Sequence, residues 1–330
     1  MTRLTRRRLG TTLVALAALG ATLCAPLARA QEAYPSRPVK LVVPYPPGGT
    51  TDLLARAIAP RLGERLGQAV VIENKAGAGG VIGAQQVAKS PADGYTLVFA
   101  TIASHGIIPA LQSPPPYDPV KDFAPITLVA GTPNVLLVNN AVPARNLAEL
   151  LALARAKPGS LNFGSTSQGG SPHMSGELLK LQAGLDIVHV PYKGGGPMLI
   201  DLIGGQIQMG FDNLPSSIAQ VRGGKVRALA VTTAKRWPGA PEIPTMAEAG
   251  VPGYEMSAWF GLLAPAGTPK AVVDRLQREV AAILKLPEVE KQFFELGAEP
   301  GGMSPEDFGR YISADRDKWA KVGASGVKLQ

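Results

Sequence analysis

The sequence is poor in cysteine, histidine and aromatic residues. Its 330 residues include one Cys (Cys24) and three His, and only 5% are Phe, Trp or Tyr. A single thiol excludes a disulfide framework within the chain. The histidines His105, His173 and His189 are dispersed, with no Cys or carboxylate at ligand spacing, so we expect no metal site. No cofactor motif is complete either, and stability must come from hydrophobic cores.

The first thirty residues differ from the rest in composition. Four arginines, the last being Arg8, precede an apolar run over residues 9–23 that only Gly and Thr interrupt. Ala28-Arg29-Ala30 then matches a signal-peptidase cleavage site. The run is shorter than the roughly 20 apolar residues that cross a bilayer. We therefore interpret residues 1–30 as a signal peptide cleaved near Ala30 and predict a periplasmic protein, exported by either the ordinary or the twin-arginine route.

Removing this leader changes the charge of the chain. The leader holds five of the 33 basic residues and no acidic residue, so 28 basic residues remain against 25 acidic ones. The net charge therefore falls from +8 to +3. A basic nucleic-acid-binding surface is not expected, and Cys24 is lost with the leader.

The remainder of the chain alternates between strand and helix patterns. Residues 39–43, 69–73 and 95–100 are predicted strands, and helical spacing separates them. This alternation predicts a parallel sheet with helices on both faces. A second α/β set begins after residues 125–130, with strands predicted over residues 135–139, 162–165, 187–190, 207–212 and 226–231.

The C-terminal part differs because it is predicted to be helical. Helices are expected over residues 268–284, 287–296 and 304–322, separated by Pro and Gly. We expect them to return to the first domain and cover it, so that the chain crosses between two domains twice. The predicted limits are residues 31–131 with 254–330 for domain 1 and residues 132–253 for domain 2.

Two glycine-rich turns, at residues 44–52 and 76–80, each follow a predicted strand and precede a helix. Glycine permits close backbone approach, and free N–H groups at a helix N-terminus bind anions. The dinucleotide fingerprint fails because Ile82 stands where its third Gly belongs, and no complete phosphate-binding loop is present. Asp52, in the first helical turn, is expected to bond to backbone N–H groups rather than to a ligand.

Nucleophilic catalysis is the main alternative. Ser167 or Ser171 with His173 could form a hydrolase site, but a Ser and a His two residues apart at a helix start point to different faces. We favour the interpretation that Ser171 and Pro172 begin a helix whose free N–H groups face a crevice. In doubly wound sheets the strand ends meet at such a crevice, where neutral donors and Lys193 suit a small carboxylate.

Several motifs resemble one known family. The chain is similar to the Bug family of periplasmic solute-binding receptors, the receptor component of tripartite tricarboxylate transporters, over essentially the whole mature sequence. The motifs are VPYPPGGTTDLLARAIAPRL, VIENKAGAGGVIGAQQVAKSPADGYTL, YDPVKDFAPITLV, GSTSQGGSPHMSGELL and VPYKGGGPMLIDLIGGQIQMGFDN.

The resemblance implies an α/β fold of the periplasmic-binding-protein type II class, a Venus flytrap. Two doubly wound domains, joined by two crossover strands, would close over one dicarboxylate, acidic amino acid or aromatic carboxylate. It implies a monomeric receptor without enzymatic activity or cofactor, whose partner is a membrane permease or a sensor kinase.

The resemblance and the strand ends together name the candidate ligand-binding residues. A side chain at Gly79 is expected to block the approach of the backbone to the ligand. The full set is Tyr45, Pro47, Gly48, Gly49, Thr50, Ala78, Gly79, Gly80, Thr101, Ala103, Ser104, Ser165, Ser167, Gly170, Ser171, His173, Lys193, Phe211 and Asp212.

Overall fold

A computed structural model describes residues 34–324 and residue 329. The chain divides into two compact units, Met1–Ser36 and Arg37–Gln330, and every element below belongs to the second unit. The predicted signal peptide lies outside the described residues. Among those residues no helix has both the length and the apolar composition of a membrane span, and no three His, Cys, Asp or Glu side chains are grouped to hold a metal ion.

The first lobe is built around a mixed sheet. Its strands lie in the order β2-β1-β3-β9-β4, with β1 parallel to both β2 and β3, and β9 antiparallel to β3 and β4. Short β10 pairs with β4 at the far edge. The bounds are β1 Val39–Val43, β2 Val70–Asn74, β3 Thr96–Thr101, β4 Phe123–Val138, β9 Ser257–Pro265 and β10 Glu299–Pro300.

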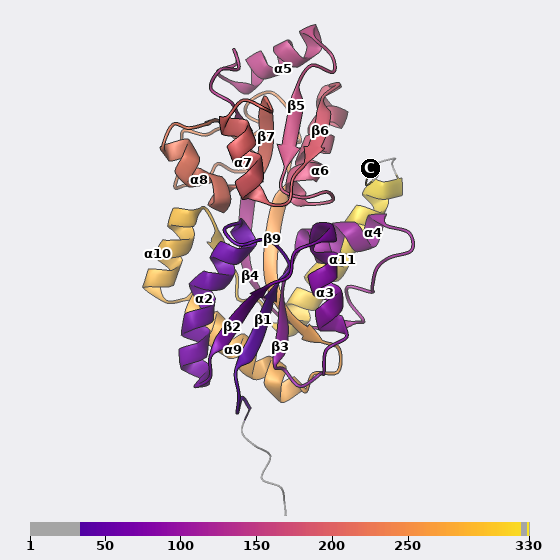
Figure 1. Ribbon diagram of the computed structural model, residues 1–330, viewed down its shortest axis with the longest axis vertical. Helices are drawn as coiled ribbons and strands as arrows, with labels where there is room; N and C mark the ends of the chain where they lie inside the picture. Colours follow the sequence, from indigo (N-terminus) through magenta and orange to yellow (C-terminus); the bar gives the residue numbers. More distant parts are fainter. Residues whose placement is uncertain (1–33, 325–328, 330) are drawn as a thin grey trace, which may run out of the picture. The chain divides into compact units, whose positions relative to one another are not determined.

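Helices from both ends of the sequence cover this sheet (Figure 1). The C-terminal helix α9 contacts α2 and β4, while α11 contacts β4 and η2, so these C-terminal helices pack against the first lobe. The bounds are α2 Thr50–Leu66, η1 Ala78–Gly80, α3 Val81–Ala88, η2 Ala103–Ile107, α4 Ile108–Leu111, α9 Lys270–Leu284, α10 Pro287–Leu296 and α11 Pro305–Ala324.

The second lobe repeats the α/β plan. Strand β5 is parallel to β6 and β7, whereas β7 and β8 are antiparallel to the upper half of β4. Its core includes Val135, Leu137, Met198 and Leu202, all fully buried. The bounds are β5 Asn162–Ser165, β6 Val188–Pro191, β7 Met209–Asn213, β8 Arg227–Val231, α5 Leu147–Ala156, α6 Ser171–Ala183, α7 Gly195–Ile203 and α8 Leu214–Arg222.

One long strand, β4, runs through both lobes. The prediction that a new strand begins at residue 135, after residues 125–130, is wrong, because β4 is continuous over the 16 residues Phe123–Val138. It pairs with β9 as far as Pro133, and from Asn134 it pairs with β7 and β8. The intervening Gly131-Thr132-Pro133 suggests a turn by composition, yet partners from distant segments keep it extended.

Strand β9 was not predicted and forms the second connection between the lobes. Eight of its nine residues are buried, so the strand shows no alternation of polar and apolar side chains. Thr232 connects β4 with the residue that precedes β9. Its N–H donates to Asn134 O, and its Oγ1 donates to Met256 O at 2.6 Å. Because β4 and β9 are antiparallel to their neighbours, each lobe has a mixed sheet rather than the fully parallel one expected.

Candidate functional site

A narrow cavity lies between the two lobes, at the ends of their strands. Its volume is about 60 Å³, room for only a few water molecules. Both lobes and the crossing strand β9 contribute to its wall. The lining residues are Tyr45, Pro46, Pro47, Gly49, Thr50, Thr51, Thr101, Ile102, Ala103, Thr166, Ser167, Gly170, Ser171, Pro172, Lys193, Gly194, Gly195, Gly196, Pro197, Asp212, Asn213, Ser216, Ala258 and Phe260.

Four helices begin at this cavity, one from the first lobe and three from the second. They are α2, α6, α7 and α8, and their N-cap residues Gly49, Gly170, Gly194 and Asn213 all line it. None of the four N-caps makes a side-chain capping hydrogen bond. The first N–H groups of a helix have no partner within the helix, and the helix dipole places positive potential there. The arrangement therefore favours a bound anion.

The lobes touch across the cavity. The hydroxyl of Thr50, at the start of α2, donates to the hydroxyl of Ser216 in α8 at 3.1 Å. A Cβ added at Gly79 would lie 2.9 Å from the carbonyl oxygen of Gln168, which belongs to the second lobe. The two lobes are therefore in contact at these loops, with little space to spare between them.

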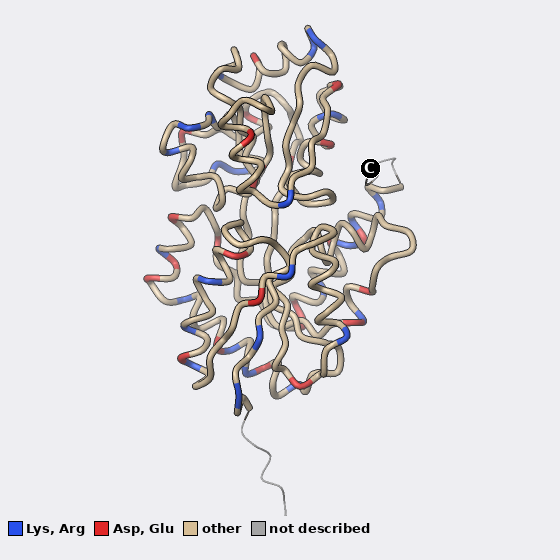
Figure 2. Tube along the Cα trace, viewed as in Figure 1, with Lys and Arg blue, Asp and Glu red and all other residues tan. Residues whose placement is uncertain are grey.

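The cavity wall carries few charges. Among the described lining residues, Lys193 and Asp212 are the only ones with charged side chains, and Figure 2 shows basic and acidic residues spread over both lobes rather than gathered by sign. Asp212 is fully buried, and burial raises the pKa of its carboxyl to about 7. Its Oδ1 accepts from Asn213 N at 2.8 Å, and its Oδ2 has no partner among the described residues. Near neutral pH, Asp212 therefore lies close to its point of half-protonation.

Tyr45 connects the three loops of the first lobe that approach the cavity. Its hydroxyl donates to Gly79 O at 2.7 Å and lies 2.9 Å from Thr101 Oγ1. Its own carbonyl accepts from Asn74 Nδ2 at 3.0 Å. Burial raises the pKa of Tyr45 to about 12, so the hydroxyl keeps its proton and remains a donor. Tyr45 thus positions the glycine-rich loop at η1 as well as lining the cavity.

Replacing Tyr45 by Phe is expected to weaken ligand binding about fivefold. The ring would still fill its place, but Gly79 O would lose a buried hydrogen bond, which contributes about 1 kcal/mol, and η1 would be held less firmly. Isothermal titration calorimetry with a carboxylate that binds the wild-type protein measures the change in affinity. Tyr192→Phe is the matched control, because that hydroxyl donates to Asp201 Oδ2 away from the cavity. Equal affinities for the two variants would contradict the positioning role of Tyr45.

Asp52 has the structural role that the sequence predicts. It is 2% exposed, and its carboxylate accepts from Gly48 N, Arg56 Nε and Asn74 Nδ2 at 2.8 to 3.0 Å. Burial alone would raise its pKa, but the hydrogen bonds from Arg56, Gly48 and Asn74 hold it below the usual value. The consequence for the site is that the Gly48 N–H is already engaged and is not free for a ligand.

Eleven of the nineteen candidate residues line the cavity and eight do not. Those in the lining are Tyr45, Pro47, Gly49, Thr50, Thr101, Ala103, Ser167, Gly170, Ser171, Lys193 and Asp212. Those outside it are Gly48, Ala78, Gly79, Gly80, Ser104, Ser165, His173 and Phe211.

The residues outside the lining have other partners. The Gly80 N–H donates to Gly77 O, and Gly80 lies behind the Tyr45 ring, since a Cβ there would be 3.0 Å from the hydroxyl. Ser104 is fully buried and pairs with His105 Nδ1 at 2.9 Å. Phe211 points into the second lobe, where it packs edge-on against Phe163.

His173 and Ser165 belong to a buried group behind the loop at residues 165–173. His173 stacks on His189 with ring centroids 3.8 Å apart, and His189 Nε2 lies 2.7 Å from Ser165 Oγ. Burial lowers the pKa of His173 to about 3, so its ring is neutral and its Nδ1 accepts from Gly169 N. The Ser171 hydroxyl donates to Asn134 Oδ1 instead of His173. The geometry therefore gives no support to the hydrolase alternative.

The candidate set omitted several lining residues. Several of these lie in turns that the strand ends did predict at the crevice: Thr51, Ile102, Thr166, Pro172 and the range 194–196. Pro197, Asn213 and Ser216 were not predicted, although they continue the predicted order of strand, turn and helix. Pro46 was not predicted at the crevice either, and Ala258 and Phe260 lie on β9, which has no recognisable pattern in the sequence.

Residues 54–325 match the model of the tripartite tricarboxylate transporter family receptors. The chain belongs to this family. Family members and similar structures are solute-binding proteins, so the chain is a solute-binding receptor rather than an enzyme. Membership also implies a periplasmic location. The resemblance and the Venus-flytrap fold that the sequence predicts are confirmed.

Three relatives illustrate the similarity. Protein BugT of Bordetella pertussis is 38% identical, over 91% of this chain and 92% of its own. The structure of Rpa4515 of Rhodopseudomonas palustris with adipate is 46% identical, with a TM-score of 0.86 over 88% of this chain and 97% of that one. The structure of MatC from the same organism, with bound malate, is 34% identical, with a TM-score of 0.84 over 88% of this chain and 100% of that one.

Proposed function

We propose that this receptor captures a small carboxylate in the cleft between its lobes and delivers it to the membrane permease of a tripartite tricarboxylate-type transporter. The observation that carries the proposal is the meeting of four helix N-termini without side-chain caps at one cavity. Their N–H groups would hold a carboxylate by neutral donors and helix dipoles.

A dicarboxylate is the ligand class that the cleft suits best. One carboxylate would face the helix starts, and the second would face Lys193, the only cationic side chain among the described residues of the wall. The similar structures hold adipate and malate, which are both dicarboxylates. Acidic amino acids and aromatic carboxylates are the alternative ligand classes against which dicarboxylates are to be compared.

Two further assignments support this function and stay proposals. Residues 31–131 with 254–330 would form one rigid domain and residues 132–253 the other, consistent with the change of pairing partners of β4 at Pro133 and Asn134. Residues 1–30 would direct export and be cleaved near Ala30, by the ordinary or the twin-arginine route.

A ligand panel tests the proposal. The exported chain would be screened by thermal shift and then by titration calorimetry against adipate, malate, glutamate and benzoate, with adipamide as the uncharged match of adipate. We expect at least one dicarboxylate to bind with micromolar affinity or better and to raise the unfolding midpoint by several degrees at saturating concentration. Binding of adipamide as tightly as adipate, or no binding by any carboxylate, would refute anion recognition at the helix starts.

A further inference from the structure

A second, larger cavity lies within the unit Arg37–Gln330 and has no part in the proposed capture of solute. Its volume is about 830 Å³, within the range of small-molecule sites. We call it the hinge groove. Its principal wall residues are Thr132, Trp237, Ser257, Trp259, Phe294 and Tyr311.

The hinge groove and the cleft lie on opposite faces of the crossing strands. Along β9, Phe260 lines the cleft, whereas Ser257 and Trp259 line the groove, and Ala258 borders both. Successive side chains of a strand point to opposite faces of a sheet. The wall between the two cavities is therefore the sheet of β4 and β9 itself.

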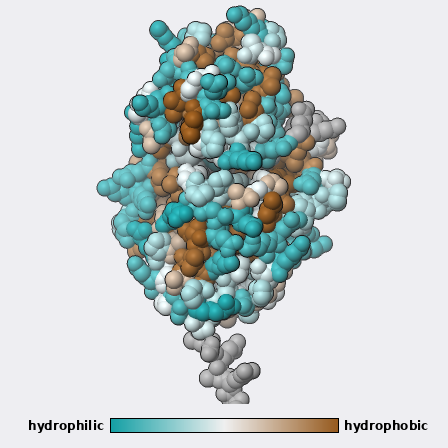
Figure 3. Space-filling model, viewed as in Figure 1, coloured by the Kyte–Doolittle hydropathy of each residue, from teal (hydrophilic) through white to brown (hydrophobic). Residues whose placement is uncertain are grey.

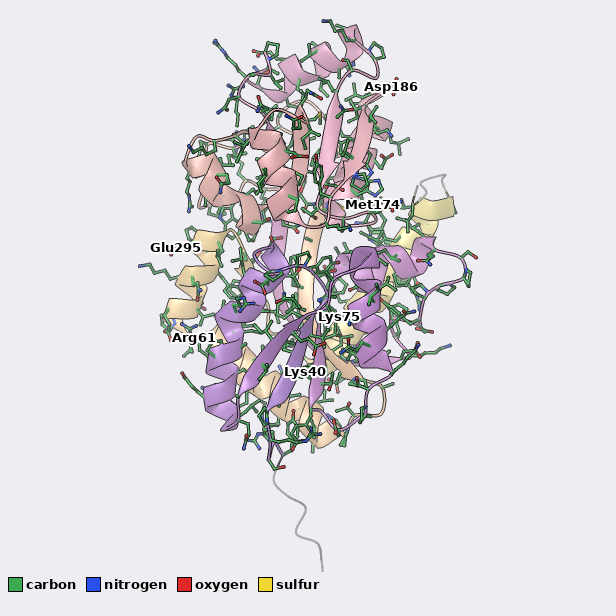
Figure 4. The ribbon with its side chains drawn as sticks, viewed as in Figure 1. Lys40, Arg61, Lys75, Met174, Asp186 and Glu295 are labelled. Atoms are coloured by element: carbon green, nitrogen blue, oxygen red, sulfur yellow. The ribbon has the colours of Figure 1, made fainter. Side chains whose placement is uncertain are left out.

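Both lobes contribute to the groove. Trp237 follows β8 of the second lobe, and Phe294 lies on α10 of the first lobe, with 5.6 Å between the two ring centroids. Figure 4 places Glu295, the next residue of α10, on the outer side of that lobe. A rotation about β4 and β9 that opens the cleft must bring the groove walls together, because the walls lie on the other side of the rotation axis.

The chemistry of the groove is aromatic with a cationic rim. The accessible aromatic surface consists of Phe294, which is 46% exposed, and the half-buried Trp237, whereas Trp259 is 2% exposed and packs edge-on against Tyr311 behind it. Such surfaces bind planar rings. On the face of the molecule shown in Figure 3, apolar residues form small patches that hydrophilic residues separate from one another.

The rim favours a negative charge on the ligand. Lys235, Arg236 and Lys291 line the groove against Glu290 and Glu299. Arg236 is paired with Glu248 at 2.8 Å, but Lys235 has no ion pair among the described residues and is exposed. An anionic group on the ligand would form an ion pair with Lys235.

We infer that the hinge groove binds a planar aromatic anion, and that a bound anion holds the cleft closed and so raises its affinity for solute. The second half of this inference rests on the proposed function. A ligand that fills the groove opposes the narrowing that opening requires, so it binds the closed form better and shifts the population toward it.

The first test measures binding to the groove alone. The fluorescent aromatic sulfonate 1-anilinonaphthalene-8-sulfonate would be titrated into the exported chain and into Phe294→Ala and Lys235→Glu. We expect each variant to weaken binding of the probe at least fivefold with little change in the unfolding midpoint. Ile200→Ala is the matched control, because Ile200 is 71% exposed on α7, outside the groove. Equal losses in the control, or none in the groove variants, would overturn the site.

The second test measures coupling to the cleft. Ser257 is exposed in the groove wall, so Ser257→Trp fills the groove at little cost to folding. We expect it to abolish binding of the probe and to tighten adipate binding about threefold to tenfold. Unchanged adipate affinity with the probe site lost would refute coupling, and competition between probe and adipate would place the probe in the cleft. If no carboxylate binds at all, the proposed function fails while the first test still decides the groove.

Discussion

Replacing Gly79 by Val is expected to reduce ligand affinity at least a hundredfold while the protein remains folded. A Cβ at this position would lie 2.9 Å from Gln168 O and 2.3 Å from Ile108 Cδ1. The isoleucine side chain can move, but the backbone carbonyl belongs to the opposite lobe and can only retreat if the cleft opens. The sequence led us to expect that a side chain at Gly79 would keep the ligand away from the backbone. The structure indicates instead that this side chain would keep the two lobes apart.

A pair of alanine variants separates obstruction of closure from backbone strain. Gly79 and Gly48 both have positive φ, +65° and +81°, but a Cβ at Gly48 meets nothing within 4 Å. Both substitutions should cost about 1 kcal/mol of folding stability through the left-handed conformation. Only Gly79→Ala should lower affinity, by about tenfold or more, in calorimetric titration with adipate. Similar affinities for the two variants would show that Gly79 is not at a closure contact.

The affinity of the wild-type protein for a dicarboxylate is expected to fall as the pH rises from 6 to 8, and replacing Asp212 by Asn is expected to abolish this fall. Because the pKa of this buried carboxyl is about 7, it acquires a negative charge over this range, next to the cavity that holds the anion. We expect wild-type affinity to fall about tenfold, or ~1.4 kcal/mol, as the pH rises. Lys193 is the only other charged side chain among the described lining residues.

The same substitution should change the pH dependence of stability in a defined direction. The pKa of Asp212 rises from 3.8 to about 7 on folding. Its contribution to stability is therefore complete below about pH 4 and is lost as the pH rises through 7. Asp212→Asn should unfold at a higher temperature than the wild type at pH 8.

Asp186→Asn is the control for both measurements, since Asp186 is exposed just before β6, at the end remote from the cleft (Figure 4). The explanation fails if affinity and unfolding midpoint of Asp212→Asn depend on pH as strongly as those of the control.

Local patterns predicted much of the secondary structure. Strands β1 and β5 begin and end at the predicted residues, and β2, β3 and β6 are displaced by one residue. In these segments a short run rich in β-branched or apolar residues ends at a polar or glycine-rich turn, so neighbouring residues carry the signal. The crossing strands lack such a signal, because eight of the nine residues of β9 are buried and β4 passes through a segment that resembles a turn.

In the candidate site, too, some features follow from the local sequence and others depend on residues far away in the chain. Glycine, serine and proline at the helix starts indicated an anion site from the sequence alone, because local geometry leaves the first N–H groups of a helix without partners. Which of these groups remain free depends on remote contacts. The Gly48 N–H donates to Asp52, and Tyr45 holds Gly79 O through a contact spanning 34 residues.

The sequence by itself determined the family, the two α/β sets and the kind of chemistry, since each depends on motifs or periodicities of adjacent residues. Only the tertiary structure decided which residues of the predicted turns line the cleft, which residues meet across it, and that a groove lies behind the crossing strands. Those features arise where β9, α10 and the segment after β8 come together, and side-chain packing between segments so distant in the chain leaves no periodic trace in the sequence.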